Sequence, residues 1–281
     1  MIIKVLVSGA MPFLRLMKGV KGYALLDRPS WIKGFSMRKE YRRDPLWPIL
    51  VEVVKRNPAY EGHKARVRDE ILPEKPDITP EELSKLLSIP VGEALVILDE
   101  LRITVQEVKE ELSKPLPQPT YERVAIGGTF NEIHYGHLML ILMALRLGRR
   151  VLIGVTTDEF VKRLDKEHEV RSYAERVEGL RRELEKRGWL ERCKIIPLSD
   201  PYGPTVEDPS IEVLVTSPFT HFRGVEINEL RVKRGLKPLR IVVCPLVVAE
   251  DGKPLSSTRI AKGEISLDGK SIRGSRHPDH Q

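Results

Sequence analysis

The stretch Val124–His137, VAIGGTFNEIHYGH, is the most informative part of the sequence. It begins with apolar, partly β-branched residues that are typical of a buried strand, and this run ends at Gly127 and Gly128. Glycines let the backbone approach a phosphate group closely. Thr129 adds a hydroxyl group, and Phe130 follows it. We therefore expect a phosphate-binding loop directly after a strand.

The same stretch carries two histidines at the start of a predicted helix. His134 and His137 are three residues apart, which brings both side chains close to the helix N-terminus. Two imidazoles and the positive end of a helix dipole concentrate positive potential at one point. Such a site would stabilise a phosphate that gains negative charge in a transition state.

Predicted strands and helices alternate through the C-terminal half of the chain. Short apolar runs predict strands at residues 121–126, 149–156, 194–198, 213–216 and 240–243, and the helical pattern predicts helices at 135–147 and 173–189. This order predicts an α/β fold, a Rossmann-like, doubly wound parallel sheet with helices on both faces. Such folds bind ligands at the carboxyl ends of strands, where the strand order reverses.

A second phosphate-binding segment is predicted in AEDGKPLSSTRIAKGEI, residues 249–265. Ser256, Ser257 and Thr258 open a helix there, so free backbone N–H groups and three hydroxyls are available to a triphosphate. Arg259 follows them and adds a cation.

A proline-rich run divides the chain. Residues 116–120 belong to SKPLPQPT, which cannot continue a helix and predicts a linker. It separates an N-terminal region of unknown role, residues 1–115, from an α/β domain at 121–270. Residues 271–281 are expected to form a disordered tail.

The N-terminal region is predicted to contain a helical module at about 63–112, with helices at 64–72, 79–87 and 92–101. The last two resemble a helix-turn-helix. The second of them has no Lys or Arg, whereas binding to DNA phosphates needs cations. A trihelical packing or dimerisation module is therefore the alternative to DNA binding.

Charge is distributed unevenly along the chain. The 281 residues include 47 basic and 40 acidic side chains, a net charge of +7. Residues 1–68 carry a net charge of +10, residues 69–120 one of −7, and residues 121–281 one of +4. Residues 1–60 interleave basic and aromatic side chains, which is typical of a nucleic-acid-binding surface. It is also typical of a small basic domain with an aromatic core, and both alternatives stay open.

Composition excludes several other classes of protein. A chain with 41% hydrophobic residues can bury a core, which excludes global disorder. Two cysteines, Cys193 and Cys244, exclude a disulfide scaffold and are expected in the core. Leu138–Leu145 is the most apolar run and is far shorter than the roughly 20 residues of a membrane span. We expect a cytoplasmic protein with no membrane partner.

Taken together, GGTFNEIHYGH and PLSSTRI resemble the two motifs of the His-x-Gly-His nucleotidyltransferase superfamily, which joins a nucleoside monophosphate to a phosphorylated acceptor. Further segments, among them VLIGVTTDEFVKR and INELRVKRGLKPLRIVV, are similar to the archaeal phosphopantetheine adenylyltransferases. The resemblance covers about Val124–Gly269. It implies adenylyl transfer from ATP to 4′-phosphopantetheine, giving dephospho-coenzyme A and pyrophosphate in coenzyme A biosynthesis. It also implies Mg²⁺ bound with ATP, without a protein cage for the metal.

The resemblance implies roles for the residues that match its motifs. His137 would stabilise the α-phosphate in the transition state, with His134 beside it. The other matched residues would bind substrates. The acceptor phosphate and ATP would be bound by Gly127, Gly128, Thr129 and Phe130. The β- and γ-phosphates would be bound by Ser256, Ser257 and Thr258 with Arg259 beside them, and the acceptor phosphate would also be contacted by Lys162 or Lys166. Arg176 resembles a substrate-binding family arginine, with an exposed helix charge as the alternative.

Two positions depart from the family pattern. Asn131 stands where the family usually has Asp, and Ala261 where archaeal members often have a second Arg. Two alternatives remain. One is a related nucleotidyltransferase that acts on nicotinamide mononucleotide or an alcohol phosphate. The other is a nucleic-acid-binding regulator that senses a coenzyme precursor.

Overall fold

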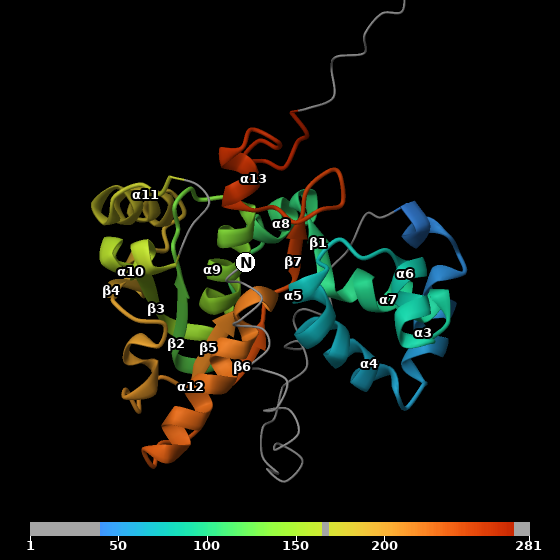
Figure 1. Ribbon diagram of the computed structural model, residues 1–281, viewed down its shortest axis with the longest axis horizontal. Coiled ribbons are helices and arrows are strands. Elements are labelled where there is room, and N and C mark those ends of the chain that lie inside the picture. The colour runs from blue at the N-terminus through green and yellow to red at the C-terminus, as the bar shows by residue number, and fades with distance from the viewer. Residues whose placement is uncertain (1–39, 165–168, 273–281) are drawn as a thin grey trace, which may run out of the picture.

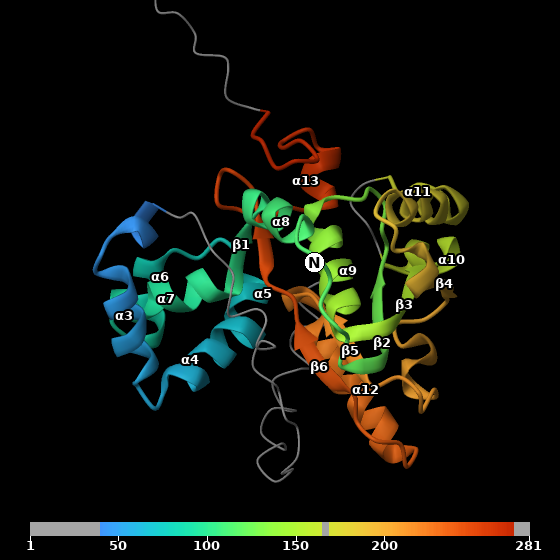
Figure 2. The same cartoon turned by 180° about the vertical axis from the view of Figure 1, so that it is seen from behind.

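The structure is a computed structural model that describes residues 40–164 and 169–272 (Figure 1). An α/β part contains the sheet, and a helical region formed by residues 47–101 lies beside it, at right in Figure 1 and at left in Figure 2. Each part has its own apolar core. The predictions for residues 1–39, for Lys166 and for residues 273–281 lie outside the described residues.

The strand β2 (Tyr121–Gly128) is the centre of a five-stranded parallel sheet with the order β4-β3-β2-β5-β6. The other strands are β3 (Gly148–Thr156), β4 (Cys193–Leu198), β5 (Val213–Thr216) and β6 (Arg240–Val243). The chain adds strands first on one side of β2 and then on the other, so the strand order reverses between β2 and β5. The predicted doubly wound sheet is confirmed, and the ligand crevice of such a fold lies at the carboxyl ends of these two strands.

Helices cover both faces of the sheet because alternate strand residues point to opposite sides. Val124 and Ile126 pack in one core with α9 (Tyr135–Leu147) and α11 (Tyr173–Lys186). Ala125 packs in another core with α12 (His221–Lys233). The short elements are α10 (Asp158–Arg163), α13 (Ser257–Ala261) and the 3-10 turns η5 (Leu190–Arg192), η6 (Gly203–Val206) and η7 (Pro218–Thr220).

The helical region follows the 3-10 turn η3 (Glu40–Arg43). It consists of α3 (Trp47–Lys55), α4 (Tyr60–Arg66), the π-helical turn η4 (Val67–Ile71), α5 (Leu72–Glu74), α6 (Pro80–Leu87) and α7 (Val91–Leu101). Helix α6 begins at a capping box between Thr79 and Glu82 and ends at Ser88, which has a left-handed backbone. Seven of the eleven residues of α7 are buried. This helix is therefore a core element, and it offers little surface for reading DNA.

Many cations of the helical region are paired with nearby carboxylates. Such pairs join Lys55 to Glu100, Lys64 to Glu61, Arg66 to Glu70, and Lys75 to Glu82. One apolar row of α3 is exposed to solvent, namely Leu46 just before the helix with Ile49 and Val53. The part of this region that the structure describes therefore resembles a packed helical domain more than a basic surface.

A short strand and a helix join the two parts. The strand β1 (Arg102–Thr104) pairs in parallel with β7 (Leu246–Val248), and neither strand was predicted. Helix α8 (Val105–Leu112) follows and packs against α9. Ile103 and Val108 belong to the core that contains α9. The predicted linker at 116–120 thus comes after an element that is already packed in the α/β core.

A buried ion pair fixes α8 to α9. The guanidinium of Arg146 lies 2.7 Å from a carboxylate oxygen of Glu111 and donates a second hydrogen bond to the Glu111 carbonyl at 3.0 Å. Both side chains are about 95% buried. Removing one partner would leave a buried charge without compensation, so this pair specifies where α8 lies.

The predicted element boundaries are close to the observed ones. The helix at 135–147 and the strands at 213–216 and 240–243 match, and α11 ends three residues earlier than predicted. The helix predicted at 64–72 is instead α4 followed by a π-helical turn. Ser271 of the predicted tail bridges to Ile265. No helix within 40–164 and 169–272 has the length and apolar character needed to cross a membrane.

Candidate active site

The loop after β2 has a strained backbone. Phe130 has a φ of 52°, a left-handed conformation that non-glycine residues seldom adopt and that costs about 1–3 kcal/mol. Its ring is buried and packs over Gly128, where an added Cβ would lie 3.1 Å from Phe130 Cε2. The glycine is therefore needed for this close approach. Strain that the surrounding structure maintains is a feature of binding and catalytic loops.

The two histidines lie directly beside this loop at the start of α9. Their imidazole rings stack with centroids 3.9 Å apart, and the His137 ring also lies 5.1 Å from the ring of Phe130. His134 is the N-cap of α9, and its Nδ1 accepts a hydrogen bond from the backbone N–H of Gly136 at 3.1 Å. The backbone N–H of His134 donates to Nδ1 of His137 at a longer 3.5 Å.

These contacts determine which ring nitrogens can donate. In both histidines Nδ1 acts as an acceptor, so a neutral ring carries its proton on Nε2. Burial, with repulsion from His137, holds the pKa of His134 well below its usual value. His134 is therefore neutral at pH 7 and offers one N–H group at the helix N-terminus.

The two predicted phosphate-binding segments meet at Gly136. A Cβ built on this residue would lie 3.8 Å from the carbonyl oxygen of Leu255, the residue before Ser256. It would also lie 2.9 Å from Cε1 of His134, so only glycine leaves room for the ring. Figures 1 and 2 both show α13 above the start of α9. The fold thus brings together segments about 120 residues apart in the sequence.

The serine-rich segment uses part of its polar groups internally. Ser256 is the N-cap of α13 and accepts a hydrogen bond from the N–H of Arg259 at 3.3 Å. Ser257 and Thr258 begin the helix and are half-buried. The Arg259 guanidinium forms ion pairs with Asp251 and Glu264, the latter at 3.0 Å. These pairs hold the arginine against its own segment, and its predicted place beside the β- and γ-phosphates stays a prediction.

Arg176 is a buried side chain of α11. Its side chain is fully buried and donates to the carbonyls of Thr129 and Arg171 at 2.9 Å each. It also donates to Thr156 Oγ1 at 3.3 Å and Asp158 Oδ1 at 2.9 Å. The structure thus contradicts the alternative of an exposed helix charge, and the arginine is directed at protein groups. Sequence reasoning missed Thr156 and Asp158, although Thr156 ends a predicted strand and Asp158 lies two residues beyond it.

The remaining predicted residues lie near the loop. Lys162 is exposed in the last turn of α10. Asn131 is buried, and its side chain accepts from the N–H of Arg171 at 2.8 Å and donates to the Glu169 carbonyl at 3.3 Å. An ionised aspartate could not donate that second bond. The departure at position 131 therefore has a local structural reason. Nothing in the structure explains Ala261.

Helix α8 reaches the edge of the same site. The Lys109 ammonium lies 5.2 Å from the ring centroid of Tyr135, the residue between His134 and Gly136. This cation–π contact was missed because Lys109 lies before the predicted linker and carries no motif.

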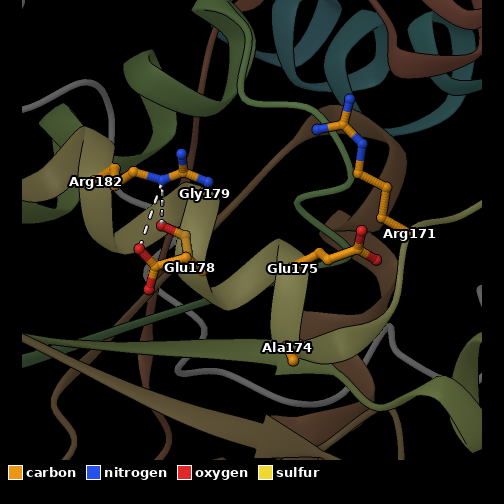
Figure 3. A pocket seen from close by; sticks show the side chains of 6 residues that line it. All are labelled: Arg171, Ala174, Glu175, Glu178, Gly179 and Arg182. Carbon is orange, nitrogen blue, oxygen red and sulfur yellow. Dashed lines mark hydrogen bonds and ion pairs between the residues drawn. The ribbon is translucent and has the colours of Figure 1, made fainter.

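A hollow of about 390 Å³ lies elsewhere, on the outer surface of α11. Figure 3 shows its charged rim, in which Arg182 and Glu178 form an ion pair, and its lining by Ala174 and Gly179. None of the predicted site residues lines it. Arg171, at one end, connects it to the loop through Asn131. We therefore locate the candidate active site at the histidine pair.

The fold and the site together define a cytidylyltransferase-like protein, and the family model of that description matches residues 125–263. A phosphopantetheine adenylyltransferase of Methanopyrus kandleri is 47% identical over 149 residues, which is 53% of this chain and 94% of that protein. A phosphopantetheine adenylyltransferase of Methanosarcina mazei is 43% identical over 151 residues, 53% of this chain and 96% of that protein. The chain belongs to the phosphopantetheine adenylyltransferase family.

A third relative has a different organisation. The bifunctional phosphopantetheine adenylyltransferase/NTP phosphatase of Thermoplasma volcanium is 39% identical over 148 residues, 53% of this chain and 44% of that protein. The helical region of residues 47–101 lies outside the range that the family model matches.

Proposed function

We propose that the chain catalyses adenylyl transfer from ATP to 4′-phosphopantetheine, giving dephospho-coenzyme A and pyrophosphate in coenzyme A biosynthesis. The observation that carries the proposal is the stacked pair of His134 and His137 at the N-terminus of α9, next to the serine-rich segment. This arrangement lies in a chain that is 47% identical to a phosphopantetheine adenylyltransferase.

The reaction is a direct displacement at the α-phosphorus of ATP. An oxygen of the acceptor phosphate forms the new P–O bond as the bond to the pyrophosphate oxygen breaks, and pyrophosphate carries the leaving electrons. No covalent bond to the protein is needed, so catalysis consists of positioning and charge stabilisation. Negative charge grows on the α-phosphate oxygens in the transition state. The Nε2–H groups of His137 and His134 are the donors for these oxygens.

The surrounding segments supply the binding groups. The backbone of Gly127–Phe130 and the Thr129 hydroxyl would bind the acceptor phosphate and ATP. The hydroxyls of Ser257 and Thr258, with Ser256 as the cap, would bind the β- and γ-phosphates. Lys162 or Lys166 would supply the cation for the acceptor phosphate. Arg259 would keep the serine segment in place through its two carboxylate partners.

Mg²⁺ would enter with the triphosphate. Within residues 40–164 and 169–272, no group of three or more His, Cys, Asp or Glu side chains is arranged to hold a metal ion. Mg²⁺ often retains several waters and binds through substrate phosphates, which fits these residues. When bound, the ion would neutralise part of the charge of the β- and γ-phosphates.

The test is a comparison of acceptors on the purified full chain. ATP is supplied with 4′-phosphopantetheine, nicotinamide mononucleotide or choline phosphate in parallel, and the nucleotide products are identified by mass spectrometry. We expect dephospho-coenzyme A as the dominant product. A faster reaction with either other acceptor would replace the proposed substrate, and no product with any of the three would refute adenylyl transfer.

A further inference from the structure

The hydrogen-bond donors of the Arg176 side chain are almost all bound to protein groups. Its side chain has no exposed surface, and four of its five N–H donors contact protein acceptors. These acceptors belong to three separate segments: the loop after β2, the end of β3 with the start of α10, and the segment before α11. A side chain placed in this way holds the three segments together and has only one N–H donor that is not bound to protein.

The contact with Thr129 has a specific consequence for the loop. In a trans peptide the carbonyl and the following N–H point in opposite directions. The Thr129 carbonyl points to Arg176, so the N–H of Phe130 points away from it. Among the described residues, none accepts a hydrogen bond from that N–H, although Phe130 is about 99% buried. The peptide is thus held with an unused donor, directly before the strained backbone of Phe130.

We propose that Arg176 is a positioning residue that fixes the orientation of the Thr129–Phe130 peptide and so keeps the Phe130 N–H available to a phosphate oxygen of the substrate. The proposal rests on the proposed function for the identity of the substrate, whereas the peptide orientation itself does not depend on it. Without the guanidinium, rotation of this peptide would relieve the left-handed conformation of Phe130 and turn the donor away.

Lysine could not replace this arginine. Its ammonium is a compact group, whereas the planar guanidinium reaches acceptors on several sides at once. Asp158 completes the arrangement by contributing the one carboxylate among the four acceptors. Hydrogen bonds to the backbone N–H of Tyr173 and to Arg176 hold the pKa of Asp158 below its usual value.

Arg231 provides a matched control on the other face of the sheet. It is also buried, and it also donates to backbone carbonyls, those of Lys237 at 2.7 Å, Thr205 at 2.6 Å and Asp208 at 2.9 Å. None of these groups belongs to the loop after β2. A Lys substitution at either position removes a buried guanidinium, but only one of them releases the Thr129 carbonyl.

The experiment compares Arg176→Lys with Arg231→Lys in the full chain by two measurements. The first is amide hydrogen exchange of the peptide covering residues 127–131. The second is kcat and KM for ATP, at a temperature where both variants are folded. We expect at least 10-fold faster exchange in the loop and at least 10-fold lower kcat for Arg176→Lys only, with less than a 3-fold change in KM. Thr156→Val removes a single acceptor and should give a smaller change in the same direction if Arg176→Lys does not fold.

Any of three results would overturn the proposal. The first is unchanged exchange at residues 127–131 in Arg176→Lys, or in Thr156→Val if that variant replaces it. The second is an equal loss of kcat in Arg231→Lys, which would show a general effect of lost stability. The third is a rise in KM with kcat unchanged, which would assign Arg176 to substrate binding instead. If the wild-type chain forms no dephospho-coenzyme A, the proposed function fails, and the exchange measurement alone decides the role of Arg176.

Discussion

The imidazole rings of His134 and His137 lie 3.9 Å apart in a stacked arrangement, and each ring uses Nδ1 as a hydrogen-bond acceptor. In a neutral ring the proton is therefore carried by Nε2. The stack depends on the N-cap position of His134 and on the glycine two residues later.

His137→Ala should lower kcat about 100-fold or more, because it removes a donor to charge that develops in the transition state. KM for ATP should change much less. Steady-state kinetics with 4′-phosphopantetheine measures both constants, and circular dichroism checks that the fold is retained. A folded variant with the wild-type kcat would remove His137 from the mechanism.

Gly136→Ala should lower kcat about 10- to 100-fold, since the added Cβ would lie 2.9 Å from His134 Cε1 and the ring would have to move. Gly179→Ala is the matched control. Gly179 lies within α11, and an added Cβ would have no neighbour within 4 Å. Alanine there should stabilise the helix by about 0.5–1 kcal/mol and leave kcat unchanged. Equal activity of the two variants would show that the close packing at Gly136 is unimportant.

Stability should fall in mild acid because of His134. Its pKa in the folded chain is well below the value of about 6.5 in an unfolded chain, so below that pH the unfolded state binds more protons. The contribution is complete above about pH 6.5 and is lost as the pH falls, at up to about 1.4 kcal/mol per pH unit. The pKa of His221 is lowered in the same direction, mainly by burial.

The variant His134→Asn distinguishes the contribution of His134 to this pH dependence from that of His221. Asn is a good N-cap, so the helix start is preserved, and His221 is retained. Urea unfolding at pH 7.5 and pH 5.5 should show a loss of stability larger by about 1 kcal/mol in the wild-type chain than in this variant. The same pH dependence in both proteins would mean that His134 is not a buried neutral group.

Glu111→Ala should destabilise the chain by about 3–5 kcal/mol, because Arg146 would keep a buried charge without its partner. The double variant Glu111→Leu with Arg146→Met should cost much less. Glu70→Ala is the control, since its pair with Arg66 is exposed and contributes at most about 1 kcal/mol. Urea unfolding curves measure all three. If Glu111→Ala resembled Glu70→Ala, the ion pair would not fasten α8 to α9.

Much of the α/β part could be predicted because its signals are local. Ten consecutive residues of α9 are buried, and the first eight of them, Leu138–Leu145, appear in the sequence as an apolar run with the glycines and histidines before it. The strands β1 and β7 have three residues each and pair across more than 140 positions, so no local pattern indicates them. The contacts between α8 and α9 are also distant in the sequence. For this reason α8 was assigned to the N-terminal region, before the predicted linker.

Two arginines of the site show most clearly what local sequence patterns do not predict, namely the partners of a side chain. Arg176 and Arg259 both lie in helices with charged neighbours, and sequence reasoning assigned both to substrates. Arg176 reaches acceptors in distant segments, among them Thr129 and Asp158. Arg259 pairs with Asp251 and Glu264 of its own segment, but at spacings that no regular helical pattern indicates. The histidines differ, because a spacing of three residues at the start of one helix already brings their side chains together.

Exchange of labelled pyrophosphate into ATP tests the central claim most directly. In direct transfer the forward reaction consumes 4′-phosphopantetheine, and the reverse reaction, which puts label into ATP, consumes the dephospho-coenzyme A formed from it. A mixture that starts with ATP and labelled pyrophosphate therefore cannot exchange without the acceptor. We therefore predict that label enters ATP only when 4′-phosphopantetheine is present, and that His137→Ala slows this exchange about 100-fold. Exchange without the acceptor would reveal an adenylated protein intermediate. The absence of exchange with the acceptor would contradict the proposed reaction.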